Sequence, residues 1–398
     1  GLRALRAPHP APRRRYRRAG AGMPPAAAGI PSGAAAAGRP KNFRKGLLAH
    51  MVLVPAWTVA PALLLSGLVT TGAPHGWKGV LLSMGLGAGL IQSGGPATRG
   101  PLCLAVIGIG AAAPTGRVLS TLAGVVCCVL AWFCKGTTKD FKRRPELFEF
   151  LTTWRADYYE QAEVRFCAPD DVRRDRSCFG FHPHGCLSAG FTINGCFNPE
   201  FHKRVGKASY LCDANLRYKN PFFRMMCDGV RRDDFEIDAA DKKTFLKKMG
   251  KGESIVFIPG GFQDAVAFRH GKDCTVLKRR KGFIKYCLQH GYRVHPVYTF
   301  GESETFYSFT GLRKLRTKIS EYNVPMVAFY GWPCFPLLPR PQSRLLSYVG
   351  PALVLPHKPE PTAEDVDLWH GKYMEALVKL FDEKRAEAGW PDAHLELL

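Results

Sequence analysis

The sequence predicts an α/β domain that follows an apolar, membrane-embedded N-terminal region. Residues 1–139 contain no Asp or Glu but 16 Lys and Arg, so most of the net charge of +23 lies in the first third of the chain. Such asymmetry is typical of contact with nucleic acid or membranes. The acid-free third is also the most apolar one, and its cations do not alternate with aromatic residues. We therefore expect membrane lipids as a partner and exclude nucleic acid.

The N-terminal region divides into a tail and a membrane segment. Residues 1–45 are mostly Arg, Ala, Pro and Gly, which cannot build a packed core, so we interpret them as a disordered basic tail. Residues 46–138 form the predicted membrane region, with spans at about 47–70 and 118–134. Both runs lack charged residues and can cross a hydrocarbon core of about 30 Å.

Basic clusters flank this region on both sides, which places both ends in the cytosol and makes the number of crossings even. Two crossings, a helical hairpin, are our prediction. The Gly-rich blocks between the two spans leave four crossings open. A buried helical pair of a soluble protein is the alternative.

Residues 139–398 have the composition of a globular domain, which we expect to face the cytosol. Its short apolar runs predict buried strands, and its amphipathic runs predict helices that alternate with them, as in an α/β sheet. The predicted strands are 178–181, 254–258 and 294–300, and the predicted helices are 241–249, 282–290 and one that starts at Thr362 with Asp365 as a capping box and ends at Gly389.

Two strand ends bring together groups suited to acid–base chemistry. The first predicted strand runs into His182-Pro183-His184-Gly185, where a general base belongs in such folds. The second ends in Gly260-Gly261, whose backbone N–H groups can stabilise an oxyanion, followed by the carboxylate of Asp264. Taken alone, two histidines in a loop are more often structural or metal-binding than catalytic.

Two further charged segments are candidate site residues. Lys278, Arg279, Arg280 and Lys281 precede a predicted helix, where cations are poorly placed unless an anion neutralises them. A solvated charge run is the alternative. Glu302 and Glu304 follow the third strand and either line the site or cap a turn.

Several classes of chemistry are disfavoured. The 13 cysteines include no C-x-x-C and no metal-type spacing, so we expect reduced thiols and no metal. No G-x-S-x-G elbow, P-loop or H-E-x-x-H motif occurs, which argues against hydrolase, kinase and metalloprotease functions.

Taken in order, these segments resemble the type 2 diacylglycerol acyltransferase family, which includes monoacylglycerol and wax-alcohol acyltransferases. The resemblance covers about residues 154–391. The matching segments are F-G-F-H-P-H-G at 179–185, P-G-G-F-Q-D at 259–264, R-K-G-F-I-K at 280–285, P-V-Y-T-F-G-E-S at 296–303 and Y-M-E-A-L-V-K-L-F-D at 373–382.

The resemblance implies a sheet like that of the glycerol-phosphate acyltransferases, acyl-CoA as co-substrate with no other cofactor, and a glycerolipid acceptor. It also implies residence in the endoplasmic reticulum membrane and on lipid droplets. The chain departs from the family in two places. Asp264 stands where many members have Glu, and Tyr158-Tyr159-Glu160 replaces a Tyr-Phe-Pro motif.

We expect direct esterification of diacylglycerol to triacylglycerol. In this hypothesis His184, oriented by Asp264, removes the hydroxyl proton, while His182 shapes the loop with Gly185. The amides near Gly260 and Gly261 receive the oxyanion. Residues 279–281 would bind the phosphates of coenzyme A. A monoacylglycerol or wax-alcohol acyltransferase is the alternative, as is a non-catalytic lipid-droplet scaffold, and a homo-oligomer stays open.

Overall fold

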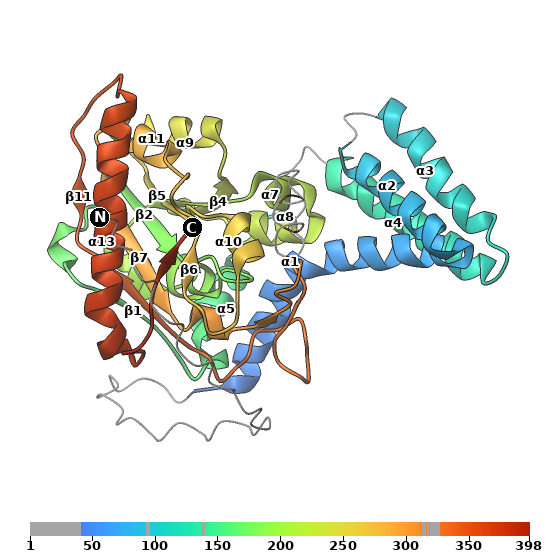
Figure 1. Cartoon of the computed structure of the whole chain (residues 1–398), viewed down its shortest axis with the longest axis horizontal. Coiled ribbons are helices and arrows are strands. Elements are labelled where there is room, and N and C mark those ends of the chain that lie inside the picture. Colours follow the sequence, from blue (N-terminus) through green and yellow to red (C-terminus); the bar gives the residue numbers. More distant parts are fainter. Residues whose placement is uncertain (1–40, 93–95, 137–139, 313–315, 317, 319–326) are drawn as a thin grey trace, which may run out of the picture. The chain divides into compact units, whose positions relative to one another are not determined.

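The computed structural model describes residues 41–92, 96–136, 140–312, 316, 318 and 327–398. Its centre is a mixed sheet in which the strands follow the order β1-β10-β7-β2-β5-β3-β4, with β11 also paired to β7 (Figure 1). The strands of this sheet are β1 (Gln161–Phe166), β2 (Ser177–His182), β3 (Ala208–Cys212), β4 (Phe235–Ala239), β5 (Ser254–Phe257), β7 (Arg293–Phe300), β10 (Arg344–Val349) and β11 (Leu353–Val354).

The middle of the sheet is parallel. Strand β2 pairs in parallel with β5 on one side and with β7 on the other, whereas β10 and β11 are antiparallel to β7. All six residues of β2 are buried, as expected for a central strand covered on both faces. The predicted strands at 178–181, 254–258 and 294–300 correspond to β2, β5 and β7, so these predictions are confirmed.

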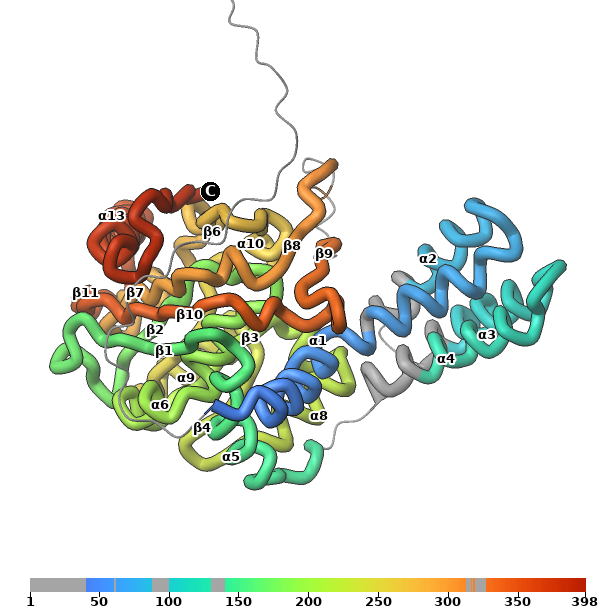
Figure 2. Tube along the Cα trace, turned by 90° about the horizontal axis from the view of Figure 1, so that it is seen from below, coloured from blue at the N-terminus to red at the C-terminus, as the bar shows by residue number. Residues whose placement is uncertain are grey.

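Each face of the sheet is covered by its own hydrophobic core. Along β2, Phe179 and Phe181 join one core and Cys178 joins the other, because successive strand side chains point to opposite faces. The first core includes residues of α1, α5, α6 and α8, and the second includes residues of α9, α11 and α13. Figure 2 shows α13 on one side of the strands and α1, α5, α6 and α8 on the other.

Several helices of the domain begin at a residue whose side chain caps the first turn. They are α5 (Pro145–Trp154), α6 (Pro199–Val205), α7 (Ala214–Lys219), α8 (Pro221–Gly229), α9 (Lys242–Met249), α10 (Phe262–Ala267), α11 (Gly282–His290) and α13 (Ala363–Ala388). Thr362 and Asp365 form the predicted capping box of α13, and Gly389 ends the helix in a left-handed conformation. The three predicted helices are therefore confirmed as α9, α11 and α13.

Short elements complete the domain: η2 (Arg155–Tyr158), η3 (Pro169–Asp171), η4 (Phe191–Cys196), η5 (Glu302–Glu304), β6 (Cys274–Thr275) paired with β12 (Glu396–Leu397), and β8 (Tyr307–Ser308) paired with β9 (Phe329–Tyr330). Strand β6 matters for the site, because it brings a threonine beside the His-Pro-His-Gly segment.

Four apolar helices precede the domain: α1 (Phe43–Gly72), α2 (Gly76–Gln92), α3 (Pro96–Ala111) and α4 (Arg117–Gly136), with η1 (Ala73–His75) between the first two. Within the described part of the chain, one helical run, 43–87, is long and apolar enough to cross a membrane by length and composition. The second predicted span falls on α4, whose apolar part is shorter, so a transmembrane hairpin is not shown. Residues 1–40 of the predicted tail lie outside the described residues.

Candidate active site

The carboxyl ends of β2 and β5 place the two predicted site loops next to each other. Because these strands are parallel neighbours, the chain leaves both at the same edge of the sheet, β2 toward His184 and β5 toward Gly260. Gly185 turns the first loop with φ of +63°, and an added Cβ there would lie 2.1 Å from Glu302 Oε1. Only glycine fits this turn.

His182 is fully buried and both of its ring nitrogens are bonded. Nδ1 lies 3.0 Å from Thr275 Oγ1 and Nε2 lies 2.9 Å from the hydroxyl of Tyr373. The hydroxyl of Thr275 donates to Asp264 Oδ2 at 2.9 Å, so Nδ1 of His182 must donate to Thr275 and Nε2 must accept from Tyr373. Burial lowers the pKa of His182 to about 3, which keeps this tautomer neutral.

His184, two residues further, is half-buried and has one nitrogen free. Its Nδ1 lies 3.1 Å from the carbonyl oxygen of Gly185, which can only accept, so Nδ1 holds the proton. Its Nε2 therefore carries a lone pair, for which the described residues offer no hydrogen-bond donor. Burial lowers the pKa of His184, so the ring stays neutral and able to take a proton at neutral pH.

Asp264 is buried in the first turn of α10 and accepts three hydrogen bonds. Its carboxylate accepts from the backbone N–H of His184 at 3.2 Å, from Thr275 Oγ1 at 2.9 Å and from the backbone N–H of Val276. Burial raises the pKa of Asp264 to about 6, although these donors act in the opposite direction. An added Cβ at Gly260 would lie 2.2 Å from Asp264 Cγ, so this glycine lets the carboxylate approach the main chain.

The structure thus brings residues 184 and 264 together in a different way from the one expected. The carboxylate of Asp264 bonds the main chain at His184, while the imidazole bonds Gly185 instead. A side-chain connection does run from Asp264 through Thr275, but it ends at His182. Asp264 therefore fixes where the backbone of His184 lies and makes no hydrogen bond to its ring in the described part of the chain.

The Gly-Gly loop supplies one free amide. The N–H of Gly261 donates to the carbonyl of Ile258 at 3.2 Å and so belongs to the turn. The N–H of Gly260 has no acceptor among the residues placed by the structure. Gly260 is also the residue whose carbonyl accepts from Arg280 Nη2, at 3.4 Å.

Glu302 is a second buried carboxylate that binds the His-Pro-His-Gly loop. Oε1 accepts from the N–H of Ala189 at 3.0 Å and Oε2 accepts from the N–H of Gly190 at 2.6 Å. Burial raises the pKa of Glu302 to about 8. Glu304 lies elsewhere and accepts from Trp390 Nε1 at 2.9 Å. The two glutamates, which the sequence did not separate, thus differ in position.

The three candidate cations also differ from one another. Arg279 is exposed, Arg280 is half-buried against the Gly-Gly loop, and Lys281 pairs with Asp367 at 2.6 Å. Burial lowers the pKa of Arg280, and the charge of Asp264 opposes this effect. Of the three, Arg280 lies nearest to the loop that holds Asp264.

Sequence reasoning missed two residues of this network, Thr275 and Tyr373. Thr275 stands in a short strand without any motif of its own. Tyr373 is the first residue of the matching segment at 373–382; it is buried in α13, and its hydroxyl reaches His182. No cluster of three His, Cys, Asp or Glu side chains suited to a metal ion occurs in the described ranges, and the 12 cysteines whose side chains the structure describes are free thiols.

Comparison with known proteins identifies the class. The family described as diacylglycerol acyltransferase matches residues 118–398, which makes the chain an acyltransferase. The chain belongs to the diacylglycerol acyltransferase family. Diacylglycerol O-acyltransferase 2 of Mus musculus is 32% identical over 282 residues, covering 65% of this chain and 69% of the relative.

Two other relatives give the same result. The Homo sapiens diacylglycerol O-acyltransferase 2 is 30% identical over the same shares of both chains, and 2-acylglycerol O-acyltransferase 1 of Bos taurus is 31% identical over 54% of this chain and 67% of its own. A crystal structure of the 1-acyl-sn-glycerophosphate acyltransferase of Thermotoga maritima aligns with a TM-score of 0.35 at 10% identity, over 86% of this chain and 98% of that chain. A likeness that distant supports no detail of the site.

Proposed function

We propose that this chain transfers a fatty-acyl group from acyl-CoA to the free hydroxyl of diacylglycerol, forming triacylglycerol, with His184 as general base. Family membership supports the reaction, and the relatives named diacylglycerol O-acyltransferase 2 support the acceptor. One structural observation carries the choice of base: His184 has its proton fixed on Nδ1 and a free lone pair on Nε2, whereas both nitrogens of His182 are bonded.

The transfer proceeds without a covalent enzyme intermediate. Nε2 of His184 takes the proton of the acceptor hydroxyl as its oxygen attacks the thioester carbon. The N–H of Gly260, left free by the turn, donates to the oxyanion that forms. When the carbon–sulfur bond breaks, the thiolate of coenzyme A leaves and takes the proton from the His184 imidazolium. Ester and free thiol result, and the enzyme returns to its starting state.

The residues around this base have positioning roles in the proposal. Asp264 and Glu302 hold the main chain of the loop on either side, at His184 and at residues 189–190. Arg279, Arg280 and Lys281 would bind the phosphates of coenzyme A, with Arg280 the most directly connected to the site. The co-substrate is acyl-CoA, and the reaction requires no other cofactor.

We also infer a membrane setting. A lipid acceptor partitions into the bilayer, and the apolar helices α1 and α4 precede the domain. The proposal places spans within about 47–70 and 118–134 in the endoplasmic reticulum membrane, a domain of the glycerol-phosphate acyltransferase type in the cytosol, and exchange with lipid droplets. The first turns of α1, where Ala49, Leu53 and Ala56 pack in the core of the domain, then lie at the membrane surface.

An acceptor panel tests the reaction. Microsomes of cells that lack their own triacylglycerol synthesis would express this chain and receive labelled oleoyl-CoA with dioleoylglycerol, 2-oleoylglycerol or hexadecanol. Labelled triacylglycerol is expected to dominate. A product formed only from hexadecanol, or no product with any acceptor, would contradict the proposal.

Monoacylglycerol is the second candidate acceptor, because the relative named 2-acylglycerol O-acyltransferase 1 is 31% identical. In the same panel it is favoured if 2-oleoylglycerol gives the higher kcat/KM. The site geometry described above is shared by both reactions, since both acceptors present a hydroxyl to His184.

A further inference from the structure

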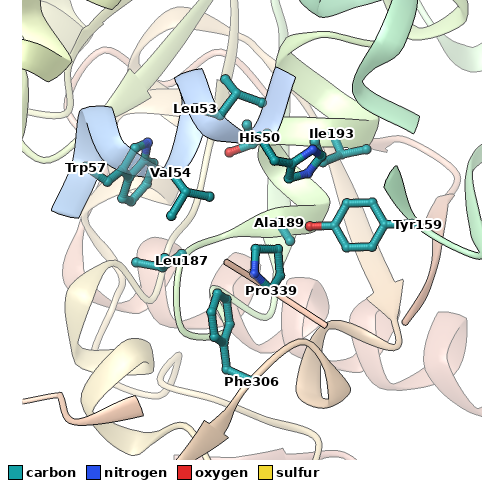
Figure 3. Close-up of a pocket in the computed structure, with 11 residues that line it drawn as sticks. His50, Leu53, Val54, Trp57, Tyr159, Leu187, Ala189, Ile193, Phe306 and Pro339 are labelled. Carbon is teal, nitrogen blue, oxygen red and sulfur yellow. The ribbon is translucent and has the colours of Figure 1, made fainter. Parts of the chain in front are cut away.

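A small apolar pocket lies between helix α1 and the His-Pro-His-Gly loop. Figure 3 shows it between Leu53, Val54 and Trp57 of α1 on one side and Leu187, Ala189 and Phe306 on the other. Leu187 lies three residues after His184, and the N–H of Ala189 is the one held by Glu302. The pocket wall and the proposed catalytic loop are therefore one segment of chain.

A buried histidine places an unpaired acceptor in this apolar pocket. His50 of α1 is 1% exposed and stacks on Tyr158 with ring centroids 4.0 Å apart. Its Nδ1 lies 3.0 Å from the carbonyl oxygen of Gly46, so Nδ1 donates and the neutral ring carries its lone pair on Nε2. That Nε2 is buried and has no hydrogen-bond partner in the part of the chain that the structure describes. An unsatisfied buried polar atom is costly, and a donor from a ligand in this pocket would satisfy it.

Tyr159 adds a donor to the same pocket. Its ring meets that of His50 edge to face, with centroids 5.1 Å apart, and its hydroxyl oxygen turns toward the pocket (Figure 3). Among residues 41–92, 96–136, 140–312 and 327–398 this hydroxyl has no hydrogen-bond partner. Burial raises the pKa of Tyr159 well above its ordinary value, so the phenol keeps its proton and can donate it.

An acceptor nitrogen beside a donor hydroxyl selects for an alcohol. An alcohol can give its proton to His50 Nε2 while its oxygen accepts from Tyr159. An ester, an ether or the thioester of acyl-CoA can accept from Tyr159 but has no proton for His50. A fatty-acid carboxylate would place a charge among apolar side chains, which is unfavourable.

We propose that this pocket binds the hydroxyl end of the lipid alcohol that the enzyme acylates, with His50 Nε2 accepting from the hydroxyl and Tyr159 donating to its oxygen. The pocket is about 30 Å³ in volume, room for one or two water-sized groups, so it admits the head of the alcohol and leaves the tails outside. Because Leu187 and Ala189 form the wall, the hydroxyl is held next to the loop that carries His184, and it leaves His50 before His184 takes its proton. This inference rests on the proposed function for the identity of the alcohol.

The first experiment measures binding without turnover. Purified full-length His184→Ala protein in detergent micelles would be titrated with labelled dioleoylglycerol and with its 3-O-methyl ether, which keeps the tails but has no hydroxyl proton. We expect about 10-fold weaker binding of the ether, the usual cost of leaving a buried acceptor unpaired. His50→Leu added to the same protein should abolish this preference, and equal affinity for both lipids before the substitution overturns the proposal.

The second experiment separates the two substrates in the active enzyme. His50→Leu should raise KM for dioleoylglycerol by about 10-fold and leave KM for oleoyl-CoA unchanged, whereas His50→Gln, which keeps an acceptor oxygen, should recover part of the loss. The matched control is His75→Leu, since the ring of His75 bonds Ile109 O outside this pocket. Equal changes in both KM values would show a merely structural role.

Tyr159→Phe covers the case in which the His50 variants fail to fold. It removes one hydroxyl and no packing volume, and it should raise KM for dioleoylglycerol several-fold with KM for oleoyl-CoA unchanged. An unchanged KM for dioleoylglycerol overturns the donor assignment.

If the acceptor panel fails while the binding preference for the alcohol persists, the proposed reaction is wrong and the alcohol site stands. The opposite pattern removes the site and keeps the reaction.

Discussion

The two histidines of the His-Pro-His-Gly segment are two residues apart in the chain and burial keeps both neutral, yet only His184 has a nitrogen free of hydrogen bonds within the described residues. His182 ends strand β2, is fully buried and has both nitrogens bonded, to Thr275 and to Tyr373. His184 lies in the loop, is half-buried and keeps Nε2 free. A residue with all its hydrogen bonds satisfied can position its neighbours, whereas a base needs a lone pair that a substrate can reach.

The contrast also separates the two buried carboxylates. Asp264 lies on the side of buried His182, to which it connects through Thr275, and it also bonds the backbone of His184. Glu302 lies at the other end of the loop, where it accepts hydrogen bonds from the backbone N–H groups of Ala189 and Gly190. The site is therefore a base on a loop that is anchored at both ends by carboxylates, and neither carboxylate bonds the imidazole of the base.

The largest expected effect is on turnover, and it distinguishes His184 in the loop from His182 at the end of β2. His184→Ala should lower kcat by about 10²–10⁴-fold, because general-base catalysis typically contributes that much. Its thermal unfolding midpoint should stay near that of the unchanged protein, since His184 is half-buried and its ring makes one local hydrogen bond. Turnover of labelled oleoyl-CoA into triacylglycerol by the purified variant measures the effect, and near-normal turnover would eliminate this base.

Breaking the hydrogen bonds of His182 should mainly lower the stability of the fold. Thr275→Val removes the hydroxyl between His182 and Asp264 and leaves the His182 N–H without an acceptor. The free energy of unfolding should fall by about 1–3 kcal/mol, the cost of an unsatisfied buried polar group. Thr275→Ser keeps the hydroxyl and is the matched control. A Thr275→Val protein as stable as the Ser variant would mean that this chain of hydrogen bonds does not anchor the loop.

The pH dependence of stability tests the contribution of Glu302, which holds the loop at Ala189 and Gly190. Burial raises the pKa of Glu302 from 4.5 to about 8, so between these pH values the folded protein retains a proton that the unfolded chain has lost. The contribution of Glu302 to the free energy of unfolding is complete below about pH 4.5. It falls as the pH rises to 8, by at most about 1.4 kcal/mol per pH unit.

Glu302→Gln should remove this slope. It should also lower stability at pH 5, because its amide nitrogen cannot accept the hydrogen bond from Ala189 or Gly190, and the difference should narrow toward pH 8. Thermal unfolding of both proteins from pH 5 to pH 8 gives the comparison. Parallel curves for the two proteins would show that Glu302 does not titrate in this range.

The smallest expected effect concerns the pH profile of the reaction. Burial lowers the pKa of His184 below its ordinary value of 6.5, so the neutral base persists into mildly acidic solution. The acidic limb of kcat/KM for diacylglycerol should therefore have its midpoint below pH 6.5. A midpoint above 6.5 would mean that the imidazolium is stabilised, as a direct carboxylate partner of the ring would do.

Much of the domain could be predicted because its signals are local. The runs that became β2, β5 and β7 are short, apolar and end at glycine or proline, and α13 begins at its Thr362–Asp365 capping box and ends at Gly389. The membrane region was harder, because apolar runs report length and composition but not whether a helix is buried against protein or lipid. One long apolar run is observed, and the second predicted span falls on a shorter helix.

By itself the sequence determined which residues stand at the strand ends, because strand periodicity and the turn preferences of Pro and Gly are properties of a few consecutive residues. It therefore supplied His182, His184, Asp264 and the glycine loop. Only the tertiary structure decided what each of them bonds. The hydroxyls of Thr275 and Tyr373 reach His182 from 93 and 191 residues away, and His50 lines a pocket whose other wall lies beyond residue 186. Such partners are set by packing among distant segments, which leaves no periodic mark in the chain.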